Sequence, residues 1–245
     1  MCRMFVFKGD ILFGTQLLNA LNRAAKSDIF NNFKSHKDGW GGVILGKQNE
    51  KLTKSMIPIY DDHASKIFDI EESEIYGLFH ARLTAPNEPV LWPFHSHPYA
   101  IHGDDETIYI AHNGWVDKKI IGEKYSIHYE NRNDTEVLAL MIEKLQGNIR
   151  GRLYSAIDFV NENALLGSLN LMCIINGNDG KREICYYSKS KDESLYITLF
   201  KYNNGNDFAV MSSSIAFEMG YIDKNGKIKN EYVEPVPQDE LFFTE

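Results

Sequence analysis

The chain opens with the stretch Met1–Asp10, MCRMFVFKGD, in which a cysteine directly precedes an apolar run. Residues 4–7 are apolar and rich in strand-forming types, which predicts a buried strand that would hold Cys2 rigidly. Once Met1 is cut off, Cys2 carries a free α-amino group with a pKa of roughly 7.7 to 8.0, so that a fair fraction of it is neutral. This amine could take the proton of its own thiol, which makes Cys2 a candidate nucleophile. Taken alone, a cysteine at this place is more often incidental.

Length and composition predict one globular domain over residues 1–245. Of these residues 43% are hydrophobic and 24% are charged, with a formal net charge of -8, as in an ordinary chain that buries its own core. An acidic chain without clustered Lys and Arg offers no surface for nucleic acid or an anionic membrane. Cys2, Cys173 and Cys185 form no C-x-x-C pair, so we expect a reducing compartment and structural roles for the last two. No signal-peptide-like or membrane-length apolar run is present, which favours the cytoplasm.

The pattern along the chain predicts strands, then helices, then strands again. Residues 86–106 are Pro- and His-rich and non-periodic, and they predict a long loop. Such an order predicts an α+β fold in which sheets are covered by helices in layers. Strands are expected at 4–7, 40–46, 51–60, 74–84, 107–112, 169–177, 182–188, 195–202 and 208–214, and helices at 15–26, 133–147 and 152–163.

Four further residues have side chains or backbone groups suited to binding an amino acid or an oxyanion. Arg82 follows a predicted strand, and arginine can hold a carboxylate by two hydrogen bonds, although a surface salt bridge is the plainer role. Asn113 and Gly114 follow another strand and could donate to an oxyanion, whereas an Asn-Gly pair is usually a hairpin turn. Asp134 begins a predicted helix. Its carboxylate could bind an ammonium group, or it could cap the helix in place of Asn133.

The order of these stretches resembles the class II glutamine amidotransferase domain of the N-terminal-nucleophile hydrolase superfamily, in particular its small stand-alone members. The resemblance spans nearly the whole chain and implies a four-layer αββα sandwich of two antiparallel sheets between helical layers. The matching stretches are MCR (1–3), DGWGGVI (38–44), HARLTA (80–85), SHPY (96–99), IAHNGWV (110–116), NDTEVLALMI (133–142) and FAVMSSSIAFEMG (208–220).

The resemblance also implies a reaction and a site. The enzyme would cleave the γ-amide of glutamine, or of a γ-glutamyl small molecule, through a cysteine thioester and release glutamate with ammonia or an amine. No cofactor or metal would be needed. Because the sequence ends at residue 245, we expect no attached synthase domain, and a separate synthase subunit could accept the ammonia. The implied roles are Cys2 as nucleophile and base, Asn113 and the Gly114 N–H as oxyanion donors, Arg82 for the α-carboxylate, Asp134 for the α-ammonium and His97 in the glutamine pocket.

The loop before the second half of the site departs from the family pattern. His95 stands where the family often has asparagine, and residues 86–105 are expanded, so substrate preference would reside in this loop. Trp92, Phe94 and Tyr99 could line a pocket for something bulkier than glutamine, although such aromatic residues are more often packed against the core.

Two other functions remain open from the sequence. A histidine-rich, metal-dependent hydrolase is the first, because five histidines gather in one region and His-x-His pairs occur in zinc sites. A non-catalytic subunit that senses glutamine or docks a synthase is the second, and retention of Met1 would favour it. The five histidines are His80, His95, His97, His102 and His112.

Overall fold

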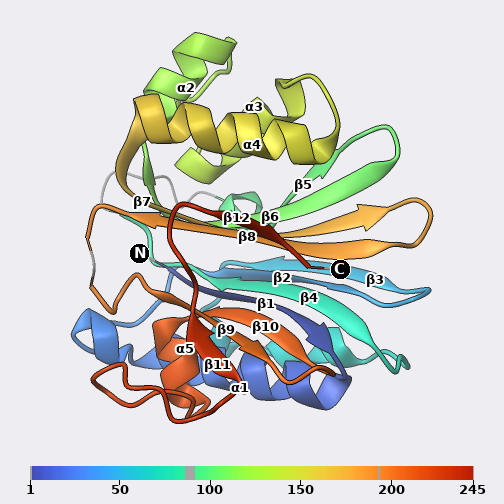
Figure 1. The fold of residues 1–245 in the computed structure, drawn as a ribbon, viewed down its shortest axis with the longest axis vertical. Helices are drawn as coiled ribbons and strands as arrows, with labels where there is room; N and C mark the ends of the chain where they lie inside the picture. The colour runs from blue at the N-terminus through green and yellow to red at the C-terminus, as the bar shows by residue number, and fades with distance from the viewer. Residues whose placement is uncertain (1, 86–91, 193, 245) are drawn as a thin grey trace.

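Two antiparallel sheets lie face to face between two layers of helices (Figure 1). The computed structural model describes residues 2–85, 92–192 and 194–244. Within these ranges no helix is long and apolar enough to cross a membrane. The two sheets and the two layers of helices confirm the predicted four-layer α+β architecture. The helices are α1 (Ile11–Lys26) and α5 (Ser213–Glu218) on the larger sheet, and α2 (Lys118–Tyr125), α3 (Asp134–Lys144) and α4 (Ile149–Phe159) on the smaller one.

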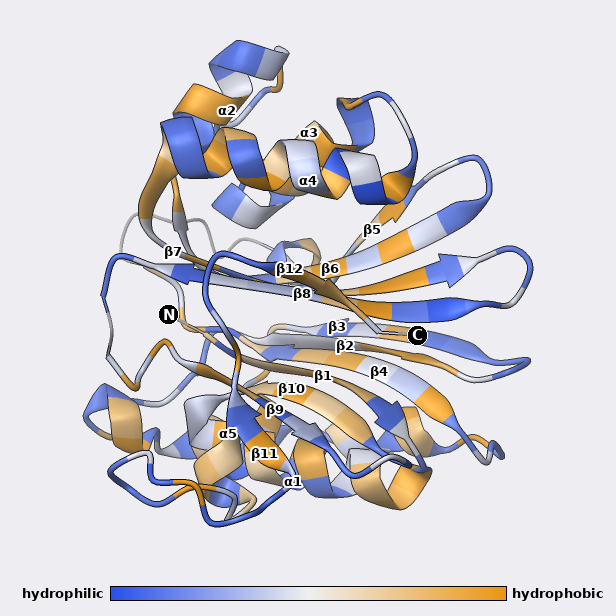
Figure 2. Cartoon of the chain, in the orientation of Figure 1, coloured by the Kyte–Doolittle hydropathy of each residue, from blue (hydrophilic) through white to orange (hydrophobic). Residues whose placement is uncertain are grey.

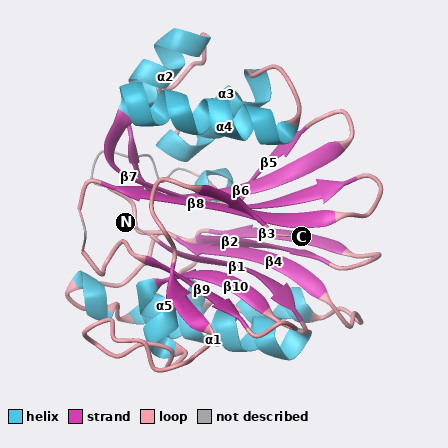
Figure 3. Ribbon diagram, in the orientation of Figure 1, coloured by secondary structure: helices cyan, strands magenta, loops and turns pink. Residues whose placement is uncertain are grey.

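Hydrogen bonding between antiparallel neighbours defines the order of strands in each sheet, and Figure 3 shows the strands in magenta. The larger sheet runs β11 (Val233–Pro235), β9 (Leu199–Asn203), β10 (Phe208–Ser212), β1 (Arg3–Gly9), β4 (Ile75–Ala81), β2 (Trp40–Leu45) and β3 (Glu50–Ser55). The smaller sheet runs β12 (Leu241–Phe243), β8 (Arg182–Ser190), β7 (Leu165–Gly177), β6 (Glu106–Val116) and β5 (Tyr99–His102). Short helical turns are η1 (Ile29–Asn31), η2 (Ile59–Asp61), η3 (Ala64–Phe68), η4 (Pro93–His95) and η5 (Val160–Ala164).

The first strand is central and buried on both faces, which explains its continuous apolar run. On one face Phe5 and Phe7 join the core under α1 and α5. On the other face Met4 and Val6 join the core between the two sheets. A third core fills the space between the smaller sheet and its helices, and Figure 2 shows apolar residues along the strands of both sheets and in the helices. Pairing with β4 holds β1 from Arg3 onward and pairing with β10 holds it from Phe5 onward, so the start of the strand is fixed in place.

The structure differs from the sequence prediction at the Asn113-Gly114 pair and in the long loop. Strand β6 continues through the pair to Val116, so the pair is not a hairpin turn. Register in the sheet overrides the local turn preference, and the strand instead has a bulge after Gly114. The described part of the predicted loop contains η4 and β5, while residues 86–91 lie outside the described residues.

Other differences concern short or weakly patterned elements. The strand expected at 51–60 ends at Ser55, and the strand expected at 208–214 ends at Ser212, where α5 takes over. Helix α2 and the edge strands β11 and β12 were not predicted. The two edge strands are 3 residues each, too short for periodicity to reveal them.

Gly41 marks a close approach between β2 and the chain at His97. A Cβ added to Gly41 would lie 2.0 Å from the carbonyl oxygen of His97, far inside contact distance. We expect Gly41→Ala to lower the free energy of unfolding by about 1–3 kcal/mol, the usual cost of overpacking, and to displace His97. Gly167→Ala is the matched control, because its Cβ would meet nothing nearer than 3.7 Å. Urea unfolding midpoints test this; equal midpoints for the two variants would contradict it.

Candidate active site

Cys2 stands at the start of β1 with its thiol held by the backbone of Leu83. The Leu83 N–H donates to Cys2 Sγ at 3.4 Å, and the thiol donates to the Leu83 carbonyl oxygen at 3.6 Å. Burial raises the pKa of the Cys2 thiol, against the opposing effects of the Leu83 N–H and of Arg82. A thiol with a raised pKa keeps its proton at neutral pH, so an attack by this sulfur needs a base beside it.

Asn113 reaches the backbone nitrogen of Cys2 from the second sheet. The Cys2 N–H donates to Asn113 Oδ1 at 2.8 Å across 111 positions of sequence. Asn113 is 1% exposed, and strand β6 fixes its backbone opposite Asn170. Since the carbonyl end of the amide is occupied by Cys2, the NH₂ end is the part of this side chain that can donate to another group.

Gly114 is a position where no side chain fits. A Cβ there would lie 1.8 Å from the Ser168 carbonyl oxygen and 2.6 Å from His112 Nε2. The residue also begins the bulge in β6. Close packing against β7 and His112 therefore requires a glycine here, and Gly114 also borders the cavity described below.

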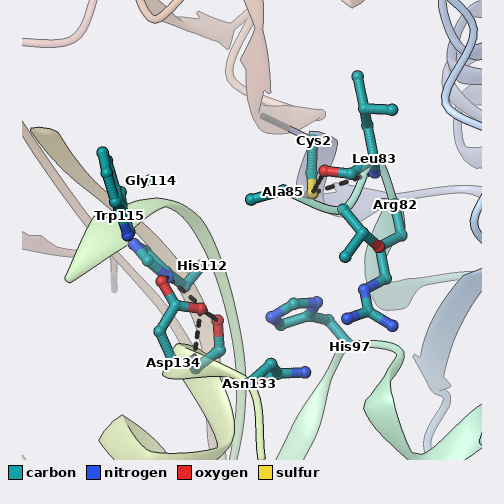
Figure 4. A pocket seen from close by; sticks show the side chains of 12 residues that line it. Cys2, Arg82, Leu83, Ala85, His97, His112, Gly114, Trp115, Asn133 and Asp134 are labelled. Carbon is teal, nitrogen blue, oxygen red and sulfur yellow. Dashed lines mark hydrogen bonds and ion pairs between the residues drawn. The ribbon is translucent and has the colours of Figure 1, made fainter. Parts of the chain in front are cut away.

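Arg82 and His97 lie together on one side of the site, across from Asp134 and His112 (Figure 4). The Arg82 N–H donates to the Gly39 carbonyl at 2.9 Å, and the Asp38 N–H donates to the Arg82 carbonyl at 3.1 Å, so the DGW stretch fixes the arginine backbone. The rings of His97 and His80 lie 3.9 Å apart between centroids. Burial holds the pKa of both imidazoles well below the usual value, and both rings are neutral at physiological pH.

Asp134 does not cap its helix. Asn133 does, because its Oδ1 accepts the Glu136 N–H at 2.8 Å. The Asp134 carboxylate instead accepts the N–H groups of Thr135 at 2.8 Å and Val116 at 3.3 Å. The competition between capping and ligand binding that the sequence left open therefore does not arise, and Asp134 presents a mostly buried negative charge.

These residues enclose one cavity of about 160 Å³. Five of the six predicted site residues line it, and the sixth, Asn113, is tied to Cys2 from behind. Figure 4 shows Cys2 at one side, Arg82 and His97 at another, and Asp134 beside His112 across from them. The arrangement offers a cation and an anion at different points of a cavity whose wall carries a thiol. Sequence reasoning gave His112 only a possible metal-binding role and Asn133 only a capping role, and it did not single out the other lining residues, which are Leu83, Thr84, Ala85, Trp115 and Thr135.

The three loop aromatics do not border this cavity. Trp92 and Phe94 are 63% and 75% exposed. Tyr99 accepts a hydrogen bond from Asn133 and packs edge to face on His97, so it supports the wall from behind. The aromatic residue at the cavity is Trp115, which directly follows Gly114. Its signal in the sequence was only its place next to the Asn-Gly pair.

A buried charged cluster lies behind Cys2. The Arg3 guanidinium and the Asp28 carboxylate form an ion pair with Nε and Oδ2 2.6 Å apart, and His36 Nε2 lies 2.8 Å from the same oxygen. All three side chains are fully buried. The pKa of Asp28 is lowered to about 2, because hydrogen bonds from His36 and Ser214 and the charge of Arg3 outweigh its burial. Burial lowers the pKa of His36 to about 4.

We expect the cluster to make folding stability fall as the solution is acidified below about pH 6.5. The unfolded chain binds a proton at His36 near pH 6.5, whereas the folded chain does so only near pH 4. The contribution of His36 to the free energy of unfolding is therefore complete above pH 6.5. It falls by about 3 kcal/mol as the pH drops towards 4. Asp28 adds a further loss as pH falls from its unfolded value, about 3.9, towards 2.

Unfolding midpoints in urea from pH 8 to pH 4.5 measure this dependence. The slope of the unfolding midpoint against pH should be smaller in His36→Gln. It should be unchanged in His128→Gln, because the ring of His128 is 67% exposed. An unaltered slope in His36→Gln would show that His36 does not carry the effect.

Solved structures with a similar fold include a glutamine amidotransferase. Glutamine phosphoribosylpyrophosphate amidotransferase from B. subtilis, complexed with ADP and GMP, matches with a TM-score of 0.66 and 13% identity over 99% of this chain. The allosteric regulatory enzyme of purine biosynthesis matches with a TM-score of 0.64 and 13% identity, also over 99% of this chain. The present chain spans 47% and 46% of these two proteins.

A protein close in length to the present chain also matches. The glutamine aminotransferase class-II domain protein from Silicibacter pomeroyi has a TM-score of 0.51 and 15% identity, over 99% of this chain and 93% of that one. No protein-family model and no curated protein matches the sequence. The likeness confirms the predicted fold, which is shared with class II glutamine amidotransferase domains.

Proposed function

We propose that the chain is a glutamine amidotransferase-type amidohydrolase that cleaves the γ-amide of glutamine, or of a γ-glutamyl compound, through a thioester on Cys2. One observation carries the proposal. The backbone nitrogen of Cys2, which becomes the free amine after cleavage before this residue, already contacts Asn113 beside a cavity with Arg82 and Asp134 in its walls. A base, a nucleophile, an oxyanion donor and two charged groups are thereby within one small site.

The charged groups suit the two ends of an amino acid. In the proposed complex Arg82 binds the α-carboxylate and Asp134 binds the α-ammonium, each by charge-assisted hydrogen bonds. His97, which is neutral, borders the same cavity and contacts the substrate chain. Holding both ends fixes the γ-carbonyl near Cys2 Sγ, which removes much of the entropic cost of the attack.

Acylation uses the amine of Cys2 as the base. The amine takes the thiol proton, the sulfur bonds to the carbonyl carbon of the γ-amide, and the carbonyl electrons move onto oxygen. The Asn113 NH₂ and the Gly114 N–H stabilise this oxyanion. The ammonium then gives its proton to the leaving nitrogen, the C–N bond breaks, and ammonia or an amine departs from the thioester.

Deacylation repeats the proton movements with water. The amine takes a proton from water, the hydroxide oxygen bonds to the thioester carbon, and the same donors hold the second oxyanion. The C–S bond breaks, the thiol regains its proton and glutamate leaves. A separate synthase subunit would use the ammonia, if ammonia rather than glutamate is the useful product.

Intact-mass spectrometry of a chain that begins at Cys2, before and after incubation with 6-diazo-5-oxo-norleucine, tests this function. We expect one adduct on Cys2, no adduct when glutamine is in excess, and none in Cys2→Ala. Glutamate release from glutamine should accompany it. Absence of both the adduct and glutamate release would contradict the glutamine pocket.

A non-catalytic glutamine sensor is the second candidate, and it rests on the same Arg82 and Asp134 pair. It would bind glutamine in calorimetry without forming the adduct and without releasing glutamate. For the metal-dependent alternative the structure offers no support, since in the described parts of the chain no three His, Cys, Asp or Glu side chains converge as a metal site.

A further inference from the structure

Arg3 follows the proposed nucleophile directly and points its guanidinium back at it. The side chain is 0% exposed. Its Nη1 donates to the Cys2 carbonyl oxygen and to the Tyr196 carbonyl oxygen, both at 3.1 Å, and the guanidinium lies 4.2 Å from the centre of the Tyr196 ring. Its Nε donates to Ser214 Oγ at 3.0 Å and lies 2.6 Å from Asp28 Oδ2.

Asp28, the partner of Arg3, is itself held by several hydrogen bonds. Asp28 accepts hydrogen bonds from His36 Nε2, from the Phe30 N–H at 3.1 Å and from the Ser214 hydroxyl. These partners come from the segment after α1 and from the start of α5. The guanidinium therefore connects the carbonyl of Cys2 to two elements of the helical layer, and the side chains of Arg3, Asp28, His36 and Ser214 are all buried.

We infer that Arg3 is a positioning residue for Cys2, an inference that rests on the proposed function. A chain that starts at Cys2 has no residue before it, so rotation about the Cα–C bond of Cys2 would swing the amine and the thiol together. Arg3 holds the carbonyl that defines this rotation. Asn113 holds the nitrogen and Leu83 the sulfur, so each of the three groups of the first residue has its own contact.

A purely structural role explains the same contacts less well. The other side chains of β1 on this face include Phe5 and Phe7, which pack in an apolar core. Replacing a buried ion pair by apolar residues is often neutral or stabilising. Moreover, Arg3 Nη2 is buried with no hydrogen-bond partner among the described residues, an arrangement that lowers stability. Arg3 thus keeps a charge beside the proposed nucleophile at a cost in folding stability, which is expected of a residue that positions Cys2.

The test compares Arg3→Lys with Phe5→Leu in chains that begin at Cys2. Lysine keeps the charge but lacks the planar guanidinium that contacts the Cys2 carbonyl, the Tyr196 carbonyl and Asp28 at once. Phe5→Leu disturbs the same face of β1 without touching Cys2. We expect Arg3→Lys to lower kcat for glutamine by about 100-fold, as a misplacement of about 1 Å does, with KM within about threefold. Phe5→Leu should keep kcat within about threefold at a similar melting temperature.

Two alkylation rates separate alignment from thiol reactivity. The glutamine analogue 6-diazo-5-oxo-norleucine must align with Cys2 as the substrate does, but iodoacetamide need not. In Arg3→Lys the first rate should fall with kcat, and the second should change by no more than about threefold. Equal losses of kcat in Arg3→Lys and Phe5→Leu, or a rise in KM with an unchanged kcat, would overturn the positioning role.

If Arg3→Lys does not fold, Ser214→Ala takes its place. This variant removes one partner of Arg3 Nε and leaves the ion pair with Asp28, so we expect a several-fold fall in kcat at constant KM. An unchanged kcat in this variant would overturn the inference. Failure of the proposed function looks different, because the unaltered chain would then neither form the adduct nor release glutamate.

Discussion

Replacing Cys2 by alanine in a chain that begins at this residue is expected to abolish glutamine hydrolysis. With the thiol gone, no thioester can form, and loss of a catalytic nucleophile lowers kcat by on the order of 10⁶-fold in a well-studied hydrolase. The fold should persist, because the substitution removes only the two weak contacts of the thiol with Leu83, while the backbone contacts of residue 2 to Asn113 and Arg3 remain. Glutamate release under saturating glutamine measures the effect.

Cys173→Ala is the matched control for this loss. Cys173 is a fully buried thiol that faces Cys185 across β7 and β8, away from the cavity residues. It should retain full glutaminase activity and at most a modest change in melting temperature. Equal activity in Cys2→Ala and the unaltered chain would remove Cys2 from the mechanism altogether.

Asn113→Ala should lower kcat by roughly 100- to 1,000-fold, the typical cost of one oxyanion donor. The substitution removes the NH₂ proposed to hold the oxyanion and also the acceptor for the Cys2 nitrogen. Far-ultraviolet circular dichroism and the melting temperature would check that the protein still folds. Because both acylation and deacylation pass through an oxyanion, kcat should fall with little change in KM.

Asn113→Asp separates the two roles of this side chain. It keeps an oxygen for the Cys2 nitrogen, but it places a carboxylate where the oxyanion forms. We therefore expect it to be at least as impaired as Asn113→Ala. If Asn113→Ala keeps near-full activity, or if Asn113→Asp restores it, the proposed donor role of Asn113 is wrong.

The parts of the fold that sequence predicts are those with strong local patterns. The apolar run after Cys2 predicted β1 as a buried strand, and a capping residue at Asn133 or Asp134 with the apolar repeat that follows predicted α3. The order of the short motifs predicted the four-layer fold, which the structure confirms. Residues near the site, such as Arg82 and Asp134, were found because each lies next to the end of a patterned element.

The parts that sequence does not predict depend on contacts between distant segments. Asn113 and Gly114 have the local signature of a turn, yet pairing with β7 keeps them extended. Leu83 holds the thiol through its backbone, which no side-chain pattern can signal. The cluster of Arg3, Asp28 and His36 joins segments that lack any shared spacing, so only the packed layers bring them together.

The central place of β1 also sets an order of events during biosynthesis. One of its two neighbours, β10, begins at Phe208, about 200 residues after Cys2 in the order of translation. At roughly 5–20 residues per second, the ribosome needs about 10–40 seconds to make that partner. Throughout this interval β1 lacks its full place in the sheet, and the bond before Cys2 stays open to an aminopeptidase. The removal of Met1 that the proposed mechanism requires therefore has this interval on the nascent chain, before the sheet closes around β1.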